Sequence, residues 1–207
     1  PDPCGLSLLE EDSIHLNQYE DLQTMIDKCN LDLLWVASPN HLHLEHIRVG
    51  LEAGLKVFSE KPIVTTKADS FSLAKLIKKY GEIQLIVGLV LRYSVHMREL
   101  RRIIDDGTLG NITSLEANEH IAPYHGSFFM RDWRRLEKYS GGFMLEKCCH
   151  DIDLYNSIVG DRPTRVASFG GRNNFIPSEA PNGNEHDDVY QKKLSFWESA
   201  EDPFTSD

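Results

Sequence analysis

A lysine follows a short apolar stretch in the motif Ser59-Glu60-Lys61-Pro62. We expect residues 56–59 to form a strand, which would place Lys61 at the carboxyl edge of a sheet, where ligands of parallel sheets bind. Pro62 keeps the preceding residue out of the helical region and so fixes how the Lys61 side chain leaves the strand. An ammonium held there could stabilise a developing alkoxide or assist deprotonation of a hydroxyl. The alternative is a solvated ion pair at a strand end, since lysine is nearly always exposed.

A second group of polar residues, Glu146, His150 and Asp153, lies within a predicted helix over residues 143–159. The spacing i, i+4, i+7 puts all three on one helical face. A carboxylate one turn from a histidine can orient the imidazole and raise its basicity, which suits proton transfer near neutral pH. The alternative is a solvated face with incidental charges, but nearby apolar residues suggest partial burial, where titratable groups are more often functional or paired.

The run Cys148-Cys149-His150-Asp151 contains only residues that can bind metals. Structural zinc sites need spaced pairs such as C-x-x-C, whereas consecutive helical residues point in different directions. We therefore predict no metal site and interpret the two cysteines as small packing residues.

A third polar segment, Ser38-Pro39-Asn40 followed by His43, comes directly after an apolar run and before a predicted helix. Backbone amides at a helix start suit anions, so Asn40 or His43 could contact a nucleotide. The alternative is an N-cap formed by Ser38 or Asn40.

The first ninety or so residues alternate between helical and strand patterns. We predict helices at 19–28, 44–53 and 67–80, and strands at 31–37, 56–59 and 83–91. This order is the signature of a parallel sheet with crossover helices, and it puts the three strand ends on one edge. Residues 1–91 are thus predicted to be the α/β part of the chain.

The pattern changes after Arg92, and residues 92–207 are predicted to form an α+β domain. We expect helices at 95–105 and 143–159, strands at 112–121, 165–169 and 190–197, and irregular structure at 122–140 and 170–188.

The composition excludes several classes of protein. The formal net charge is −10, which argues against nucleic-acid binding because phosphate backbones reward clustered Lys and Arg. The apolar runs are too short for a membrane span of about 20 residues, and no secretory signal opens the chain. Four cysteines, two of them adjacent, fit a reducing compartment, so we expect a cytoplasmic protein.

Together these segments resemble the Gfo/Idh/MocA family of glucose–fructose oxidoreductase and inositol dehydrogenase relatives. The family's Glu-Lys-Pro signature falls on residues 60–62, and its active-site helix resembles GGFMLEKCCHDIDL, which begins at Gly141. Asp132-Trp133-Arg134 resembles a Trp-Arg element before that helix, and Arg92 matches the position after the last parallel strand. Two motifs in the right order are far more specific than either alone.

The resemblance implies a Rossmann domain followed by a domain with an open, mostly antiparallel sheet, which commonly forms homo-oligomer interfaces. It implies NAD or NADP as cofactor, and a sugar, inositol or related polyol as substrate. Lys61 would polarise the alcohol or carbonyl, and His150, with Glu146, would act as general acid or base. The residues implied to bind cofactor are Ser38, Pro39, Asn40, His43, Glu60, Lys61 and Arg92; those implied to contact substrate are Arg131, Trp133, Arg134 and Asp153.

The chain departs from the family pattern at three places. Glu146 stands where the family usually has Asp, and Lys147 adds a second cation beside the site. No G-x-G-x-x-G occurs in the sequence, so we predict a fragment of a longer chain that by itself binds dinucleotide weakly or not at all. Two other functions stay open: an enzyme that uses NAD transiently to cleave a glycoside, and a regulator that has kept the fold and lost turnover.

Overall fold

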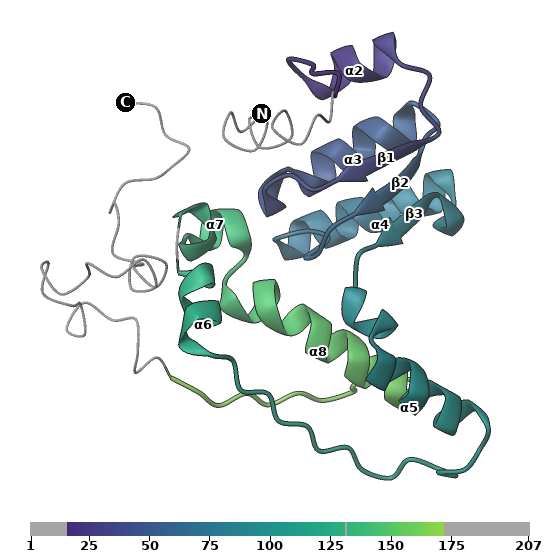
Figure 1. Ribbon diagram of the computed structural model, residues 1–207, viewed down its shortest axis with the longest axis vertical. Helices are drawn as coiled ribbons and strands as arrows, with labels where there is room; N and C mark the ends of the chain where they lie inside the picture. Colours follow the sequence, from purple (N-terminus) through teal and green to yellow (C-terminus); the bar gives the residue numbers. More distant parts are fainter. Residues whose placement is uncertain (1–15, 131, 172–207) are drawn as a thin grey trace, which may run out of the picture.

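A three-stranded parallel sheet forms the centre of the first half of the protein. The computed structural model describes residues 16–130 and 132–171 (Figure 1). Its strands β1 (Leu33–Val36), β2 (Lys56–Ser59) and β3 (Leu85–Val87) lie in the order β1-β2-β3. Leu34 pairs with Val57, and Val57 pairs with Leu85. The predicted order of parallel strands is confirmed, and the carboxyl ends of all three share one edge.

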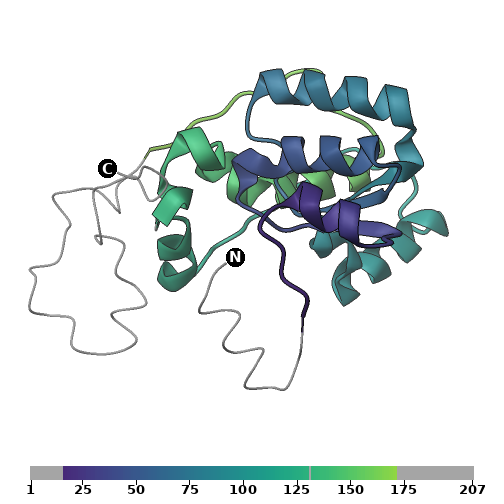
Figure 2. The same ribbon diagram turned by 90° about the horizontal axis from the view of Figure 1, so that it is seen from above.

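Three helices cover one face of this sheet: α2 (Leu22–Lys28), α3 (His43–Glu52) and α4 (Lys67–Tyr80). Figures 1 and 2 show α3 between the other two. Side-chain caps begin two of the helices, because Asp21 accepts from the Thr24 amide and Thr66 accepts from the Asp69 amide.

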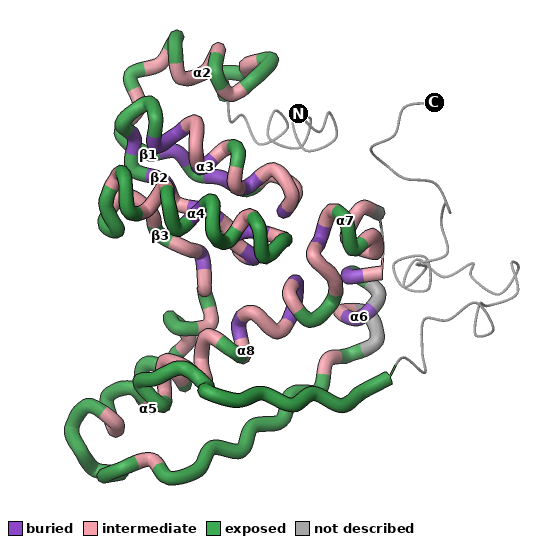
Figure 3. The backbone as a smooth tube through the Cα atoms, turned by 180° about the vertical axis from the view of Figure 1, so that it is seen from behind, coloured by how far each residue is buried: buried purple, intermediate pink, exposed green. Residues whose placement is uncertain are grey.

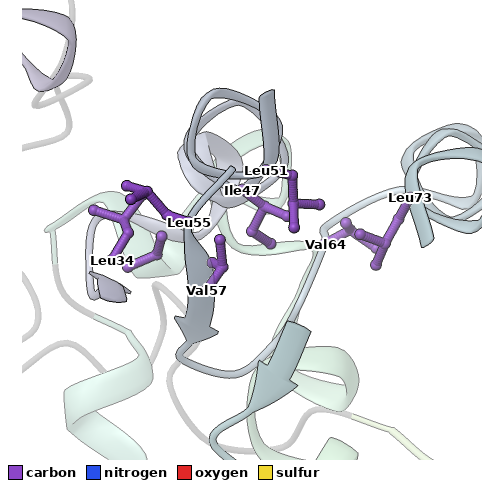
Figure 4. Packing of buried hydrophobic residues seen from close by; sticks show 8 residues of the cluster. Leu34, Ile47, Leu51, Leu55, Val57, Val64 and Leu73 are labelled. Carbon is purple, nitrogen blue, oxygen red and sulfur yellow. The ribbon is translucent and has the colours of Figure 1, made fainter. Parts of the chain in front are cut away.

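The core lies between these helices and the sheet. Figure 4 shows its central side chains, which come from β1, α3, β2, α4 and the loops on either side of β2: Leu34, Val36, Ile47, Leu51, Leu55, Val57, Val64 and Leu73. On the opposite face of the sheet, Trp35 packs on Phe58 with ring centroids 4.5 Å apart, yet Trp35 stays 61% exposed. The alternation of buried and exposed residues in β1 thus fixes the strand's two faces.

The second half of the described chain is helical. After η3 (Val90–Tyr93) come α5 (Val95–Asp105), α6 (Pro123–Phe129), η4 (Asp132–Arg135), α7 (Glu137–Ser140) and α8 (Phe143–Val159); η1 (Asn40–Leu42) and η2 (Glu82–Gln84) lie in the first half. The predictions of helices at 95–105 and 143–159 are confirmed. Within the described ranges, no helix is both long and apolar enough to cross a membrane.

Several predicted elements differ from the observed ones. Residues 122–140, expected to be irregular, contain α6, η4 and α7, and the strand expected at 83–91 is limited to β3 between two 3-10 turns. The strands expected at 112–121 and 165–169 are wrong, because neither extended segment pairs with another strand in the described residues, and both are largely exposed (Figure 3). The strand expected at 190–197 lies outside the described residues.

Candidate active site

Lys61 lies just beyond the carboxyl ends of the strands, which backbone hydrogen bonds connect to one another. The Glu60 amide donates to the Val36 carbonyl at 2.9 Å, and the Gly88 amide donates to the Ser59 carbonyl at 2.8 Å. Directly beyond, the Lys61 ammonium donates to the Glu146 carbonyl oxygen at 2.8 Å. The side chain is only 20% exposed, so the alternative of a solvated strand end is wrong.

Glu146 is the point where three segments meet. Its carboxylate is almost fully buried, and it accepts a short hydrogen bond from the Asn40 amide. One of its oxygens lies 3.7 Å from the Lys61 ammonium and 4.0 Å from Arg134 Nε. A buried carboxylate needs this degree of compensation, because an uncompensated charge in the interior is costly. The carboxylate thus joins η1, the turn after β2 and η4 to α8.

Asn40 and Ser38 do not cap α3, which was one interpretation of their position. No side-chain hydrogen bond caps that helix. Asn40 turns instead to Glu146, and the Ser38 hydroxyl lies 2.8 Å from His46 Nδ1. His43 is fully buried, with its ring nitrogens 2.8 Å from the carbonyl oxygens of Pro62 and Ser38. It therefore links the turns that follow β1 and β2.

His150 lies one turn beyond Glu146 but is not oriented by it. The His150 ring is 9% exposed, and its Nδ1 atom is buried without a hydrogen-bond partner in the part of the chain that the structure describes. Because Glu146 is engaged by Asn40 and Lys61, the prediction that it orients the imidazole and raises its basicity is wrong. Burial lowers the pKa of His150, and the positive charges of Lys61 and Lys147 lower this pKa further. Both effects favour the neutral form of the imidazole.

Arg92 and Asp153 pair with each other. The Arg92 guanidinium donates two hydrogen bonds to the Asp153 carboxylate, at 2.6 and 2.5 Å. This fork joins the turn after β3 to the middle of α8, and Asp153 is 14% exposed. Of the two, Asp153 lines the cavity that contains Lys61, whereas Arg92 does not line that cavity.

The predicted substrate wall lies in η4. The Arg134 guanidinium stacks over the rings of Phe128 and Trp133, at 4.3 and 4.4 Å from their centroids. Arg134 therefore stands beside Glu146 at the edge of the site, with Trp133 next to it. Arg131 lies outside the described residues.

Glu119 is a residue of this region that sequence reasoning missed. It accepts from the Lys147 ammonium at 2.6 Å, and Asp151 lies 3.5 Å from the same ammonium. Nothing in the sequence signals this contact, because Glu119 belongs to a segment that alternates like a strand. Phe129 was also missed; its ring lies 5.9 Å from the Lys61 ammonium.

A cavity of about 510 Å³ opens beside Lys61 and Asp153. Its walls are the loop after Pro62, the end of β3, and the face of α8 that carries Leu145 and Cys149. His150 does not line it, so the cavity reaches Lys61 and Asp153 but not the imidazole. Nowhere in residues 16–130 and 132–171 do three or more His, Cys, Asp or Glu residues gather into a group that could hold a metal ion.

Two family models match the chain. Residues 7–89 match the GFO_IDH_MocA model, described as "Oxidoreductase family, NAD-binding Rossmann fold". Residues 97–196 match the model described as "GFO/IDH/MocA C-terminal domain".

Curated relatives are 22–33% identical to this chain over the aligned residues. A Bacillus subtilis protein named as an oxidoreductase, YteT, is 33% identical over 146 residues, which are 70% of this chain and 34% of the relative. The 2,7-anhydro-N-acetylneuraminate hydratase of Mediterraneibacter gnavus is 26% identical over 151 residues, 73% of this chain and 39% of the relative. The chain thus spans less than half the length of these relatives.

Among solved structures, the fold matches scyllo-inositol dehydrogenase from Lactobacillus casei, with bound NAD(H) and scyllo-inositol. The TM-score is 0.61 at 27% identity, and the match covers 76% of this chain and 46% of the other.

Proposed function

Because the chain belongs to the Gfo/Idh/MocA oxidoreductase family, we propose that it forms part of an NAD- or NADP-dependent dehydrogenase or reductase. Its substrate would be a hydroxyl or carbonyl carbon of a sugar, inositol or related polyol. The observation that carries this proposal is the meeting of two distant motifs: the Lys61 ammonium bonds to the helix that carries His150, with Glu146 between them. The dehydrogenase relative that binds NAD(H) and scyllo-inositol supports the same substrate class.

The residues at the site fit a dinucleotide and a polyol. The Lys61 ammonium lines the cavity, where it would meet a hydroxyl of a ligand, and the buried Nδ1 atom of His150 has no hydrogen-bond partner among the described residues. We propose that the turn at Ser38 and Pro39, with Glu60, holds the nicotinamide end of the cofactor, which when bound supplies the hydride acceptor or donor. Asn40 and His43 would support this turn from behind, since their polar atoms bond within the protein.

In this mechanism, Lys61 and His150 divide the proton chemistry between them. The Lys61 ammonium, fixed by the Glu146 carbonyl, polarises the substrate oxygen and stabilises its developing negative charge. The neutral His150 accepts the hydroxyl proton during oxidation and returns it during reduction. Arg134 and Trp133 form the proposed wall that orients the substrate.

The remaining proposals concern the whole protein. Residues 1–91 would belong to the dinucleotide-binding domain, and residues 92–207 to the domain for substrate binding and oligomerisation. We place the protein in the cytoplasm as a homo-oligomer.

A second function is favoured by the hydratase relative. An enzyme of this family could use NAD transiently during the cleavage or rearrangement of a glycoside, without net oxidation. The 26% identity to the 2,7-anhydro-N-acetylneuraminate hydratase is the observation in its favour. Lys61 and His150 would then act at the same substrate carbon twice, in its oxidation and in its later reduction.

The test uses the longest reading frame that contains these residues, expressed with wild-type, Lys61→Met and Lys61→Arg sequences. We expect NADH to accumulate with at least one polyol of an inositol and sugar panel, and Lys61→Met to lower kcat by about 10²- to 10³-fold. Lys75→Met, an exposed position on α4, is the matched control and should leave kcat unchanged. NAD-dependent product formation without NADH accumulation would favour the glycoside reaction, and equal rates for the two Met variants would refute the role of Lys61.

A further inference from the structure

Lys147 is a buried lysine that the reaction described above does not use. It is 7% exposed, which is rare for lysine. Its ammonium donates to Glu119 at 2.6 Å and lies 3.5 Å from Asp151, one turn further along α8. Burial alone would lower the pKa of Lys147, but the contacts with Glu119 and Asp151 outweigh it and raise this pKa, so the ammonium stays charged.

This cluster is separate from the junction around Glu146. Glu146 pairs with Asn40, Lys61 and Arg134, whereas Lys147 pairs with Glu119, from the largely exposed segment 111–122, and with its own helix. The neighbouring residues of α8 thus point to two different charge clusters. His150 follows Lys147 by three positions, a spacing at which helical side chains are neighbours.

The charges that face His150 come from three elements. Lys61, at the end of β2, and Lys147, on α8, both favour the neutral imidazole. Asp153, on α8, and Glu119, on segment 111–122, favour the imidazolium. Asp153 is held by Arg92, and Glu119 is held by Lys147, so each carboxylate has its own cation.

We propose that Lys147 is a positioning residue for His150: its buried ammonium, anchored by Glu119 and Asp151, keeps the imidazole neutral and able to accept the substrate's proton. The inference rests on the proposed function in that it assigns His150 the role of general base. Two fixed cations lower the proton affinity of the imidazole, so that a larger fraction of His150 is unprotonated near neutral pH.

The opposing interpretation is that Lys147 only pins segment 111–122 to α8. A structural pin would affect stability and the rate at every pH alike. An electrostatic role instead predicts that the pKa of His150 changes: it rises when a nearby cation is removed and falls when a nearby anion is removed.

The test titrates His150 by NMR, with ¹³C-labelled histidine rings, in the longest reading frame that contains this chain. Comparison with His150→Gln assigns the resonance. We expect the midpoint to rise in Lys147→Met, to fall in Glu119→Gln, to stay in Lys147→Arg, and to return toward wild type in the double variant Lys147→Met/Glu119→Gln. Thermal melting of each variant reports folding.

An unchanged midpoint in folded Lys147→Met would overturn the inference. If Lys147→Met does not fold, Glu119→Gln decides, because Glu119 is 42% exposed and tolerates substitution; a midpoint that fails to fall then overturns the inference. Parallel kcat/KM profiles separate the two proposals. Titration shifts of the expected signs in a protein without dehydrogenase activity would support the electrostatic coupling and refute the proposed function.

Discussion

The packing of the turn before α8 can be tested by adding one methyl group at a glycine. Gly141 has φ +80° and ψ 6°, in the left-handed region, and Gly160 at the other end of α8 has φ +76° and ψ 13°. A Cβ at Gly141 would clash with the Leu145 side chain and lie 2.9 Å from the Thr65 carbonyl oxygen, whereas nothing lies within 4 Å of a Cβ at Gly160. The two positions thus share a backbone conformation and differ only in the space around them.

The difference in space gives different costs for the two substitutions. Left-handed backbone costs an L-residue about 1–2 kcal/mol, and the stiffer unfolded chain offsets about 0.4–1 kcal/mol of that. Gly160→Ala should therefore lower the free energy of unfolding by about 1 kcal/mol. Gly141→Ala adds overpacking worth about 1–3 kcal/mol, so we expect about 3 kcal/mol in total. For a chain of this size these values correspond to losses in Tm of about 2–4 °C and about 6–12 °C.

The assay is urea unfolding followed by circular dichroism, with differential scanning fluorimetry as a second measure. Equal destabilisation by the two alanines would refute the close approach of α8 to the loop after Pro62. Because Thr65 lies four residues beyond Lys61, Gly141→Ala should also reduce the rate through the Lys61–Glu146 contact, while Gly160→Ala should leave kcat near wild type.

Two further predictions concern stability. Burial is the main cause that lowers the pKa of His150 below its value in the unfolded chain, so the unfolded state binds more protons. The free energy of unfolding should therefore fall as the pH drops below about 6.5. Urea titrations at several pH values should show a less steep fall in His150→Gln. The fork between Arg92 and Asp153 is partly buried, so a double-mutant cycle with Arg92→Gln and Asp153→Asn should give a coupling energy of about 1–2 kcal/mol; a value near zero would mean that the pair does not hold α8 to the turn after β3.

Local sequence rules were sufficient to predict where several of the site residues lie. Strand and helix periodicity, with the ends of parallel strands on one edge, placed Lys61 at that edge, and helical spacing put Glu146 and His150 on the same side of α8. These inferences depend on local rules, which act within an element or between neighbouring strands. The family resemblance added the pairing of the two motifs, which is a contact between residues far apart in the chain.

Partners of the polar side chains could not be predicted in the same way. Helical spacing favoured a contact between Glu146 and His150, but the folded chain offers Glu146 an amide from η1 and a cation from β2, which satisfy its charge better. The strand expected at 112–121 failed for a related reason: alternation marks a segment that could pair, and only a neighbouring strand completes the ladder. The contact between Glu119 and Lys147 depends on where that segment runs in the folded chain, which its alternating sequence does not reveal.

The two charge clusters on α8 have different effects in the candidate site. The Glu146 carboxylate neutralises the cations at the buried junction. It lies near the Lys61 ammonium, which also donates a hydrogen bond to the backbone carbonyl of Glu146. Because Glu146 is occupied there, it does not favour the imidazolium of His150 as a free carboxylate would. Lys61 and Lys147 both favour the neutral imidazole of His150, while the Glu146 carboxylate stays in the junction.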